Sequence, residues 1–216
     1  MQGKRDNTEI RNTICKAAAE YKRQFVGKTF LVVYDGKCHE VLFKADNFQH
    51  LCGVESRLYA KDFFKRAVNN NLNKREIYFS KDHPYALAKK KLNALLELMD
   101  IFSKDCCIVT NMKTQTRTYR FGITDMSILL CMDNQYNGKQ KVHDYLIPYS
   151  FRVENIDKNR YEEKTKIDYI FEKPIDDKQY SKMIYGDKET LSEYLENRTI
   201  PKINMDAFVL EEEYER

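Results

Sequence analysis

One histidine of this chain lies close to a group of basic residues. His50 belongs to segment 47–53, which separates a strand-like segment from a helix-like one. An imidazole titrates near neutral pH, so it can accept or donate a proton during catalysis. Arg57, Lys61 and Lys65 follow at intervals of four residues, the spacing that places side chains on one face of a helix. These residue types suit acid–base chemistry on a phosphate ester, with His50 moving the proton and the basic face binding phosphates.

Each of these residues also has a purely structural interpretation. Charged runs on helices are commonly solvated faces, and an isolated histidine often serves only as a hydrogen-bonding group. The same applies to a second basic run, Lys89-Lys90-Lys91. The other histidines offer less: His39 follows a predicted turn and is expected at the surface, His83 precedes a proline and is interpreted as a capping residue, and His143 begins a strand.

The sequence lacks the short motifs of the common cofactor-dependent and metal-dependent enzymes. It contains neither of the glycine-rich nucleotide loops, G-x-x-x-x-G-K-[ST] and G-x-G-x-x-G. It contains no H-E-x-x-H, H-x-H or C-x-x-C for zinc and no G-x-S-x-G nucleophile turn. The pair Asp176-Asp177 has a turn-like context, whereas a two-metal nuclease needs carboxylates at the ends of apolar strands. We therefore expect no metal, no nucleotide and no other cofactor.

Composition indicates one domain with a packed core. The chain has 216 residues, 42% of them hydrophobic, and no run of about 18 apolar residues that would span a membrane. Its start is polar and lacks the apolar stretch of a signal peptide, and the six cysteines follow no disulfide spacing, so we expect a cytoplasmic protein. The net charge of +4 permits a polyanionic partner without requiring one.

Periodicity predicts a set of helices. The apolar residues repeat at helical intervals over segments 7–21, 57–69 and 84–99, the second with Ser56 as its cap. Two further short helices are predicted in the tail, near 177–184 and 188–195.

Strand patterns fill the rest of the chain. Residues 30–34 and 41–43 flank Asp35-Gly36, a dipeptide that favours the positive φ angles of a type I′ hairpin turn. Later β-prone segments are 106–111, 116–123, 126–132, 142–147 and 166–172. This order predicts an α+β fold, with N-terminal helices packed on a mostly antiparallel sheet and a helical C-terminal extension. We divide it into an N-terminal helix (1–24), a main domain (25–174) and the extension (175–216).

Several segments, in this order, follow the pattern of a known family: 30–34, 41–44, 47–54, 56–63, 80–85 and 119–125. Together they resemble a phage-associated nuclease-like family of the barnase–EndoU–colicin–RelE-like superfamily. The resemblance covers roughly residues 25–150. It implies a small α+β nuclease domain encoded by a prophage or another mobile element of a bacterium. It further implies a metal-independent ribonuclease, often a toxin.

The resemblance leads to a specific mechanism, in which the ribose 2′-hydroxyl attacks its own 3′-phosphate. His50 would be the general base or acid, and Arg57 and Lys61 would stabilise the phosphorane. This mechanism needs two titratable groups, and His50 is the only residue that we can align with one of them. The expected second donor is one of Tyr119, Arg120 and Thr124. The expected RNA-binding residues are Arg57, Lys61, Lys65 and Arg120.

Two other functions stay open from the sequence. The chain could be a catalytically inactive module of phage origin that binds a host protein or a nucleic acid. A DNA-binding regulator is the third interpretation, although no helix-turn-helix pattern is present. In the nuclease interpretation the partners are RNA and an inhibitor or host protein, with no membrane.

Overall fold

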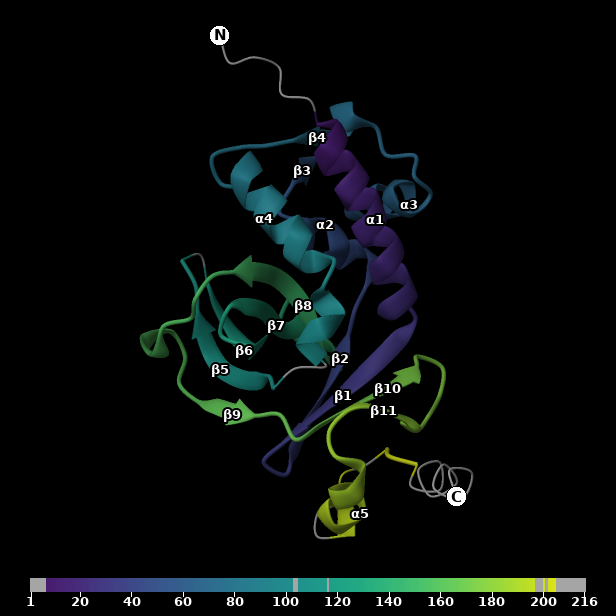
Figure 1. Cartoon of the computed structure of the whole chain (residues 1–216), viewed down its shortest axis with the longest axis vertical. Helices are drawn as coiled ribbons and strands as arrows, with labels where there is room; N and C mark the ends of the chain where they lie inside the picture. Colours follow the sequence, from purple (N-terminus) through teal and green to yellow (C-terminus); the bar gives the residue numbers. More distant parts are fainter. Residues whose placement is uncertain (1–6, 103–104, 116, 197–199, 201, 205–216) are drawn as a thin grey trace.

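The computed structural model describes residues 7–102, 105–115, 117–196, 200 and 202–204. It confirms an α+β fold with a mostly antiparallel sheet. Figure 1 shows helices α1 to α4 at one end of the molecule, a curled sheet below them and helix α5 at the opposite end. The helices are α1 (Thr8–Gln24), α2 (Phe48–Cys52), α3 (Ala60–Val68), α4 (Tyr85–Leu95) and α5 (Lys188–Glu196).

Nine strands form the main sheet in the order β11-β10-β1-β2-β8-β7-β6-β5-β9. Neighbours are antiparallel except β2 and β8, which are parallel and whose pairing is limited to Val41 and Leu146. The strands are β1 (Lys28–Tyr34), β2 (Lys37–Leu42), β5 (Cys107–Lys113), β6 (Thr118–Thr124), β7 (Ile128–Asn137), β8 (Gln140–Val153), β9 (Lys164–Lys166), β10 (Tyr169–Pro174) and β11 (Lys182–Tyr185). The short strands β3 (Glu55–Ser56) and β4 (Ile77–Tyr78) pair separately.

One continuous chain segment joins β9, at one end of this array, to β10, the second strand from the other end. Strand β9 pairs with β5, and β10, which follows after two residues, pairs with β1. The linking residues continue both ladders: Ile167 N donates to Cys106 O over 3.1 Å, and Asp168 N donates to Val33 O over 2.8 Å. The sheet is therefore rolled, as Figure 1 shows, and it has an inner and an outer face.

The main core lies between the inner face and helices α1 to α4. Aromatic side chains fill it, with Phe25 packed on Phe43 at 4.3 Å between ring centroids and Tyr21 on Phe48 at 5.3 Å. Burying one such side chain contributes about 1.5–3 kcal/mol. Two smaller apolar clusters cover the outer face, one beneath α5 and one on β5 to β7.

The predicted first helix, the hairpin and the later strands are confirmed. Asp35 and Gly36 have φ angles of 46° and 69°, as a type I′ turn requires. Two other predictions were wrong. Ser56 does not cap the third helix, because it lies in β3 and the helix begins at Ala60. Segment 177–184 is not helical, because its end pairs with β10 as strand β11.

The division into three segments stays a prediction, and α5 matches the helix predicted near 188–195. No helix among the described residues is long and apolar enough to cross a membrane. All six cysteines are free thiols.

Candidate active site

His50 lies on the short helix α2, and its side chain is exposed. Phe48, two positions earlier, turns inward and packs on Phe64 at 5.2 Å between ring centroids. Successive helix residues rotate by about 100°, so His50 faces away from this packing. None of the described residues forms a hydrogen bond with its imidazole. His50 therefore has solvent access, but no hydrogen bond from the described part of the chain orients its ring.

The predicted basic helix face contains fewer residues than the spacing in the sequence indicates. Arg57 lies before α3, so only Lys61 and Lys65 share that helix. All three side chains are exposed. Lys65 borders a shallow cavity of about 350 Å³ together with Asp62 and Arg66. One acidic and two basic side chains are thus mixed here, an arrangement that also suits a solvated helix face.

Tyr119 and Thr124 are poorly placed for contact with a substrate. Tyr119 is 6% exposed on the outer side of β6, and the Arg117 guanidinium lies 4.4 Å from its ring centroid. Thr124 is fully buried, and its hydroxyl donates to Ile128 O over 2.6 Å. The same oxygen accepts from Met126 N over 2.8 Å, so this hydroxyl closes the β6–β7 turn. We therefore leave both residues out of the candidate site.

The histidine with the strongest contacts is His39, which the sequence analysis assigned to the surface. On β2 it pairs with Val32 of β1, and its side chain is half-buried. Its ring packs on Phe121 of β6 at 4.2 Å between centroids and on Tyr34 of β1 at 5.8 Å. One signal was present in the sequence: His39, Val41 and Phe43 alternate on one face of the strand, and the latter two are buried.

Arg120, one of the predicted RNA-binding residues, comes to the same place. Its guanidinium lies 5.8 Å from the ring centroid of Phe121, the residue that also packs on His39. Its Nη1 donates to Asn134 Oδ1 over 2.8 Å. Asn134 is itself fixed, because its Nδ2 donates to Tyr145 O over 3.2 Å. The β7–β8 hairpin therefore orients the Arg120 charge beside His39.

Burial lowers the pKa of His39 to about 4, and nearby cations act in the same direction. In order of effect, these cations are Arg120, Lys141 and Lys37. At neutral pH the imidazole is consequently uncharged, and with this pKa it is a weak base in the free protein. An anion bound beside these cations would offset their charge and strengthen His39 as a base.

A cavity of about 230 Å³ opens next to His39. It lies where β2 and β8 separate beyond their single paired position, and Lys141 and Asp144 of β8 border it. Lys141 Nζ lies 2.8 Å from Asp144 Oδ1. On the other wall Glu40 accepts a hydrogen bond from Tyr180 over 2.9 Å. Lys202 pairs with Glu40 as Lys141 pairs with Asp144, so the cavity beside His39 is bordered by two ion pairs.

Tyr34 is a second titratable group at this site. Burial, followed by the charges of Cys38, Glu163 and Asp35, raises the pKa of its hydroxyl to about 12. The hydroxyl therefore stays protonated, and no described residue forms a hydrogen bond with it. Tyr34 is as buried as Tyr119, at 4% exposed, but its ring contacts His39, so it can donate a proton to a group that reaches the imidazole.

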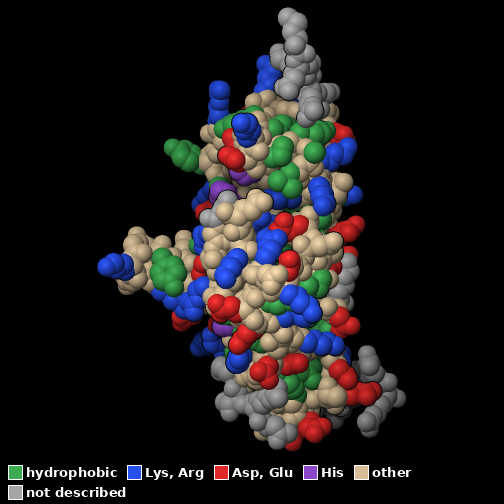
Figure 2. Space-filling view, turned by 90° about the vertical axis from the view of Figure 1, so that its left-hand side faces the viewer, with side chains coloured by type: hydrophobic (Ala, Val, Ile, Leu, Met, Phe, Trp, Pro, Cys, Tyr) green, Lys and Arg blue, Asp and Glu red, His purple; other side chains and the backbone are tan. Residues whose placement is uncertain are grey.

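The surface charge is mixed. In Figure 2, Lys and Arg side chains are interspersed with Asp and Glu over the visible face. Within the described part of the chain, no three His, Cys, Asp or Glu side chains gather in a way that could hold a metal ion. The local cations around His39 are thus more informative than the net charge.

Comparison with protein families matches residues 13–189 to PBECR4, described as phage-Barnase-EndoU-ColicinE5/D-RelE like nuclease4. The match covers more than half of the chain, including most of α1, all strands of the rolled sheet and the cluster around His39. Comparison with curated proteins and with solved structures gives no match.

Proposed function

Because the chain belongs to the PBECR4 family of phage-Barnase-EndoU-ColicinE5/D-RelE like nucleases, we propose that it is a ribonuclease with its active site at His39. The observation that carries this assignment is the contact group on the inner face of the sheet. An uncharged imidazole lies there beside an oriented arginine and a protonated tyrosine. These are the groups that RNA cleavage without a metal needs.

The reaction uses the nucleophile of the substrate itself. His39 accepts the proton of the ribose 2′-hydroxyl while this oxygen forms a bond to the adjacent phosphorus. Arg120, with Lys141 and Lys37, stabilises the added negative charge of the phosphorane. The bond from phosphorus to the 5′-oxygen then breaks, and Tyr34 supplies the proton to the leaving oxygen. The products are a 2′,3′-cyclic phosphate and a 5′-hydroxyl.

This proposal replaces His50 by His39 as the base and retains Arg120 from the sequence-based set. It adds Tyr34 as the second titratable group, which the sequence analysis did not find. Arg57, Lys61 and Lys65 stay as a hypothesis for more distant phosphates of the RNA, because all three are exposed. The phage origin named for the family favours an effector or toxin that acts in a bacterial cell carrying the prophage.

The test is cleavage of total RNA by the purified full chain in excess EDTA. We expect cleavage with the natural chain and with His50→Ala, and a loss of about 10²–10⁴-fold with His39→Ala. Mass spectrometry should find 2′,3′-cyclic or 3′-phosphate ends, and RNA methylated at the 2′-oxygen should resist. Fragments with a 5′-phosphate and a 3′-hydroxyl would exclude the mechanism. If no nucleic acid is cleaved, the binding-module interpretation takes its place.

A further inference from the structure

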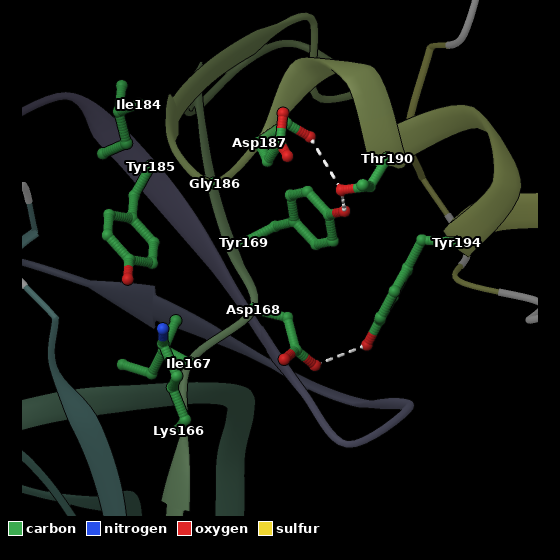
Figure 3. Close-up of a pocket in the computed structure, with 10 residues that line it drawn as sticks. All are labelled: Lys166, Ile167, Asp168, Tyr169, Ile184, Tyr185, Gly186, Asp187, Thr190 and Tyr194. Carbon is green, nitrogen blue, oxygen red and sulfur yellow. Dashed lines mark hydrogen bonds between the residues drawn. The ribbon is translucent and has the colours of Figure 1, made fainter.

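A second and larger cavity, of about 550 Å³, lies at the opposite end of the molecule from helices α1 to α4. Figure 3 shows that its walls come from the segment joining β9 to β10, from the end of β11 and from α5. It shares no lining residue with the His39 cavity. Three of its ten lining residues are tyrosines, and the polar ones are Asp168, Asp187, Thr190 and Lys166.

The tyrosine rings have fixed positions. Tyr169 Oη forms a hydrogen bond with Thr190 Oγ1 over 2.8 Å, and its ring meets that of Tyr194 edge-on at 4.8 Å between centroids. Gly186, with a φ of 121°, permits this arrangement, because a Cβ there would lie 2.3 Å from Tyr169 Cδ1. Tyr185 stands on the other side of the opening in Figure 3 and donates to Asp105 Oδ1 over 2.8 Å. Aromatic surfaces therefore line a space between α5 and the sheet.

Asp168 gives the cavity a directed hydrogen-bond acceptor. Its Oδ2 accepts from Tyr194 over 2.7 Å and from the backbone N of Asp35 over 2.9 Å. Within the described part of the chain, its Oδ1 has no hydrogen-bond donor. One oxygen thus fixes the carboxylate in place while the other can accept from a ligand.

We infer that this cavity binds one nucleobase of the RNA, a base that carries an exocyclic amino group. Three tyrosine rings line the cavity, and stacking on aromatic side chains is sequence-tolerant and is the usual way to hold an unpaired base. Selection then comes from Asp168, which accepts from the amino group of adenine, cytosine or guanine. Uracil has no exocyclic amino group, and its one ring N–H is flanked by two carbonyl oxygens that the carboxylate repels, so we expect it to bind more weakly. The inference rests on the proposed ribonuclease function and assigns its substrate preference.

The decisive variant is Asp168→Asn. An asparagine can direct its Oδ1 to the two internal donors, Tyr194 and the Asp35 amide, and thereby turn its amide NH₂ toward the cavity. The natural chain should bind adenosine, cytidine or guanosine more tightly than uridine. The asparagine variant should reverse this order and bind uridine, because the cavity would then present a donor to a base carbonyl.

Binding is measured by saturation-transfer NMR with the four free nucleosides and the full-length chain. Tyr185→Leu should weaken binding about tenfold or more, because it keeps an apolar side chain but loses the stacking face. Tyr185→Phe should retain binding, and Tyr59→Leu is the control because Tyr59 is 84% exposed and lies outside the cavity. Circular dichroism of each variant reports folding separately.

The outcomes separate this site from the proposed reaction, because nucleoside binding does not require cleavage. RNA cleavage without nucleoside selectivity would overturn the base site and leave the ribonuclease standing. Selective nucleoside binding without any cleavage would support the site and remove the proposed catalysis. Binding of N-acetyl-arginine amide in preference to every nucleoside would also overturn the inference, since the cavity would then fit an arginine of a protein partner.

Discussion

The uncharged state of His39 should make the folding stability of this chain depend on pH in a way that one substitution removes. In the unfolded chain a histidine titrates near its ordinary pKa of about 6.5, whereas burial and neighbouring cations lower the pKa of folded His39 to about 4. Between these two values the unfolded state binds more protons than the folded state. Acidification through this window therefore favours unfolding, and the full stability is present only above about pH 6.5.

The two pKa values give a loss of about 2 kcal/mol in the free energy of unfolding between about pH 7 and pH 4.5, after allowance for partial solvent screening. In His39→Gln this contribution disappears, while carboxylates elsewhere titrate as before. The difference between the two chains therefore isolates His39 even if the substitution costs stability at every pH.

The assay is urea denaturation at both pH values, followed by far-ultraviolet circular dichroism. We expect the natural chain to lose about 2 kcal/mol more than His39→Gln on acidification. Equal losses in the two chains would contradict this prediction, because His39 would then titrate alike in the folded and unfolded states.

Three further expectations concern activity and binding. Arg120→Ala should lower the RNA cleavage rate by about 10²-fold, because it removes a charge that stabilises the phosphorane. It should also shift the acidic limb of the pH profile of kcat/KM to higher pH, because it removes a cation that lowers the His39 pKa. An unchanged profile would remove Arg120 from the site. Tyr34→Phe should lower kcat with little change in KM and little loss of stability, since only a hydroxyl without a described partner is lost. Equal kcat values of this variant and the natural chain would exclude Tyr34 as the acid. In filter-binding titrations, Lys141→Glu should reduce the salt dependence of RNA affinity by roughly one unit of slope, and Lys65→Glu tests the exposed helix face in the same way.

The local elements of this fold could be predicted because short-range physics determines them. Asp35-Gly36 accepts the positive φ angles of a tight turn, and the β-prone segments on either side pair as soon as the turn forms. The first helix shows an apolar stripe of the helical period, which becomes its buried face. The two wrong predictions of secondary structure also have local causes. Ser56 resembles a cap but belongs to a short strand, and the segment before α5 forms β11 through pairing with β10.

The candidate site depended on contacts that sequence periodicity does not contain. His39 and Arg120 come from different hairpins, and the order of strands in the rolled sheet brings them to one face. His50 and the basic residues after it are neighbours in the sequence, yet Arg57 falls outside the helix and all four side chains are exposed. His39 is a candidate base because it is buried against Phe121 and lies near cations that are distant in the sequence. Such effects depend on desolvation and through-space charge, which only the tertiary structure decides.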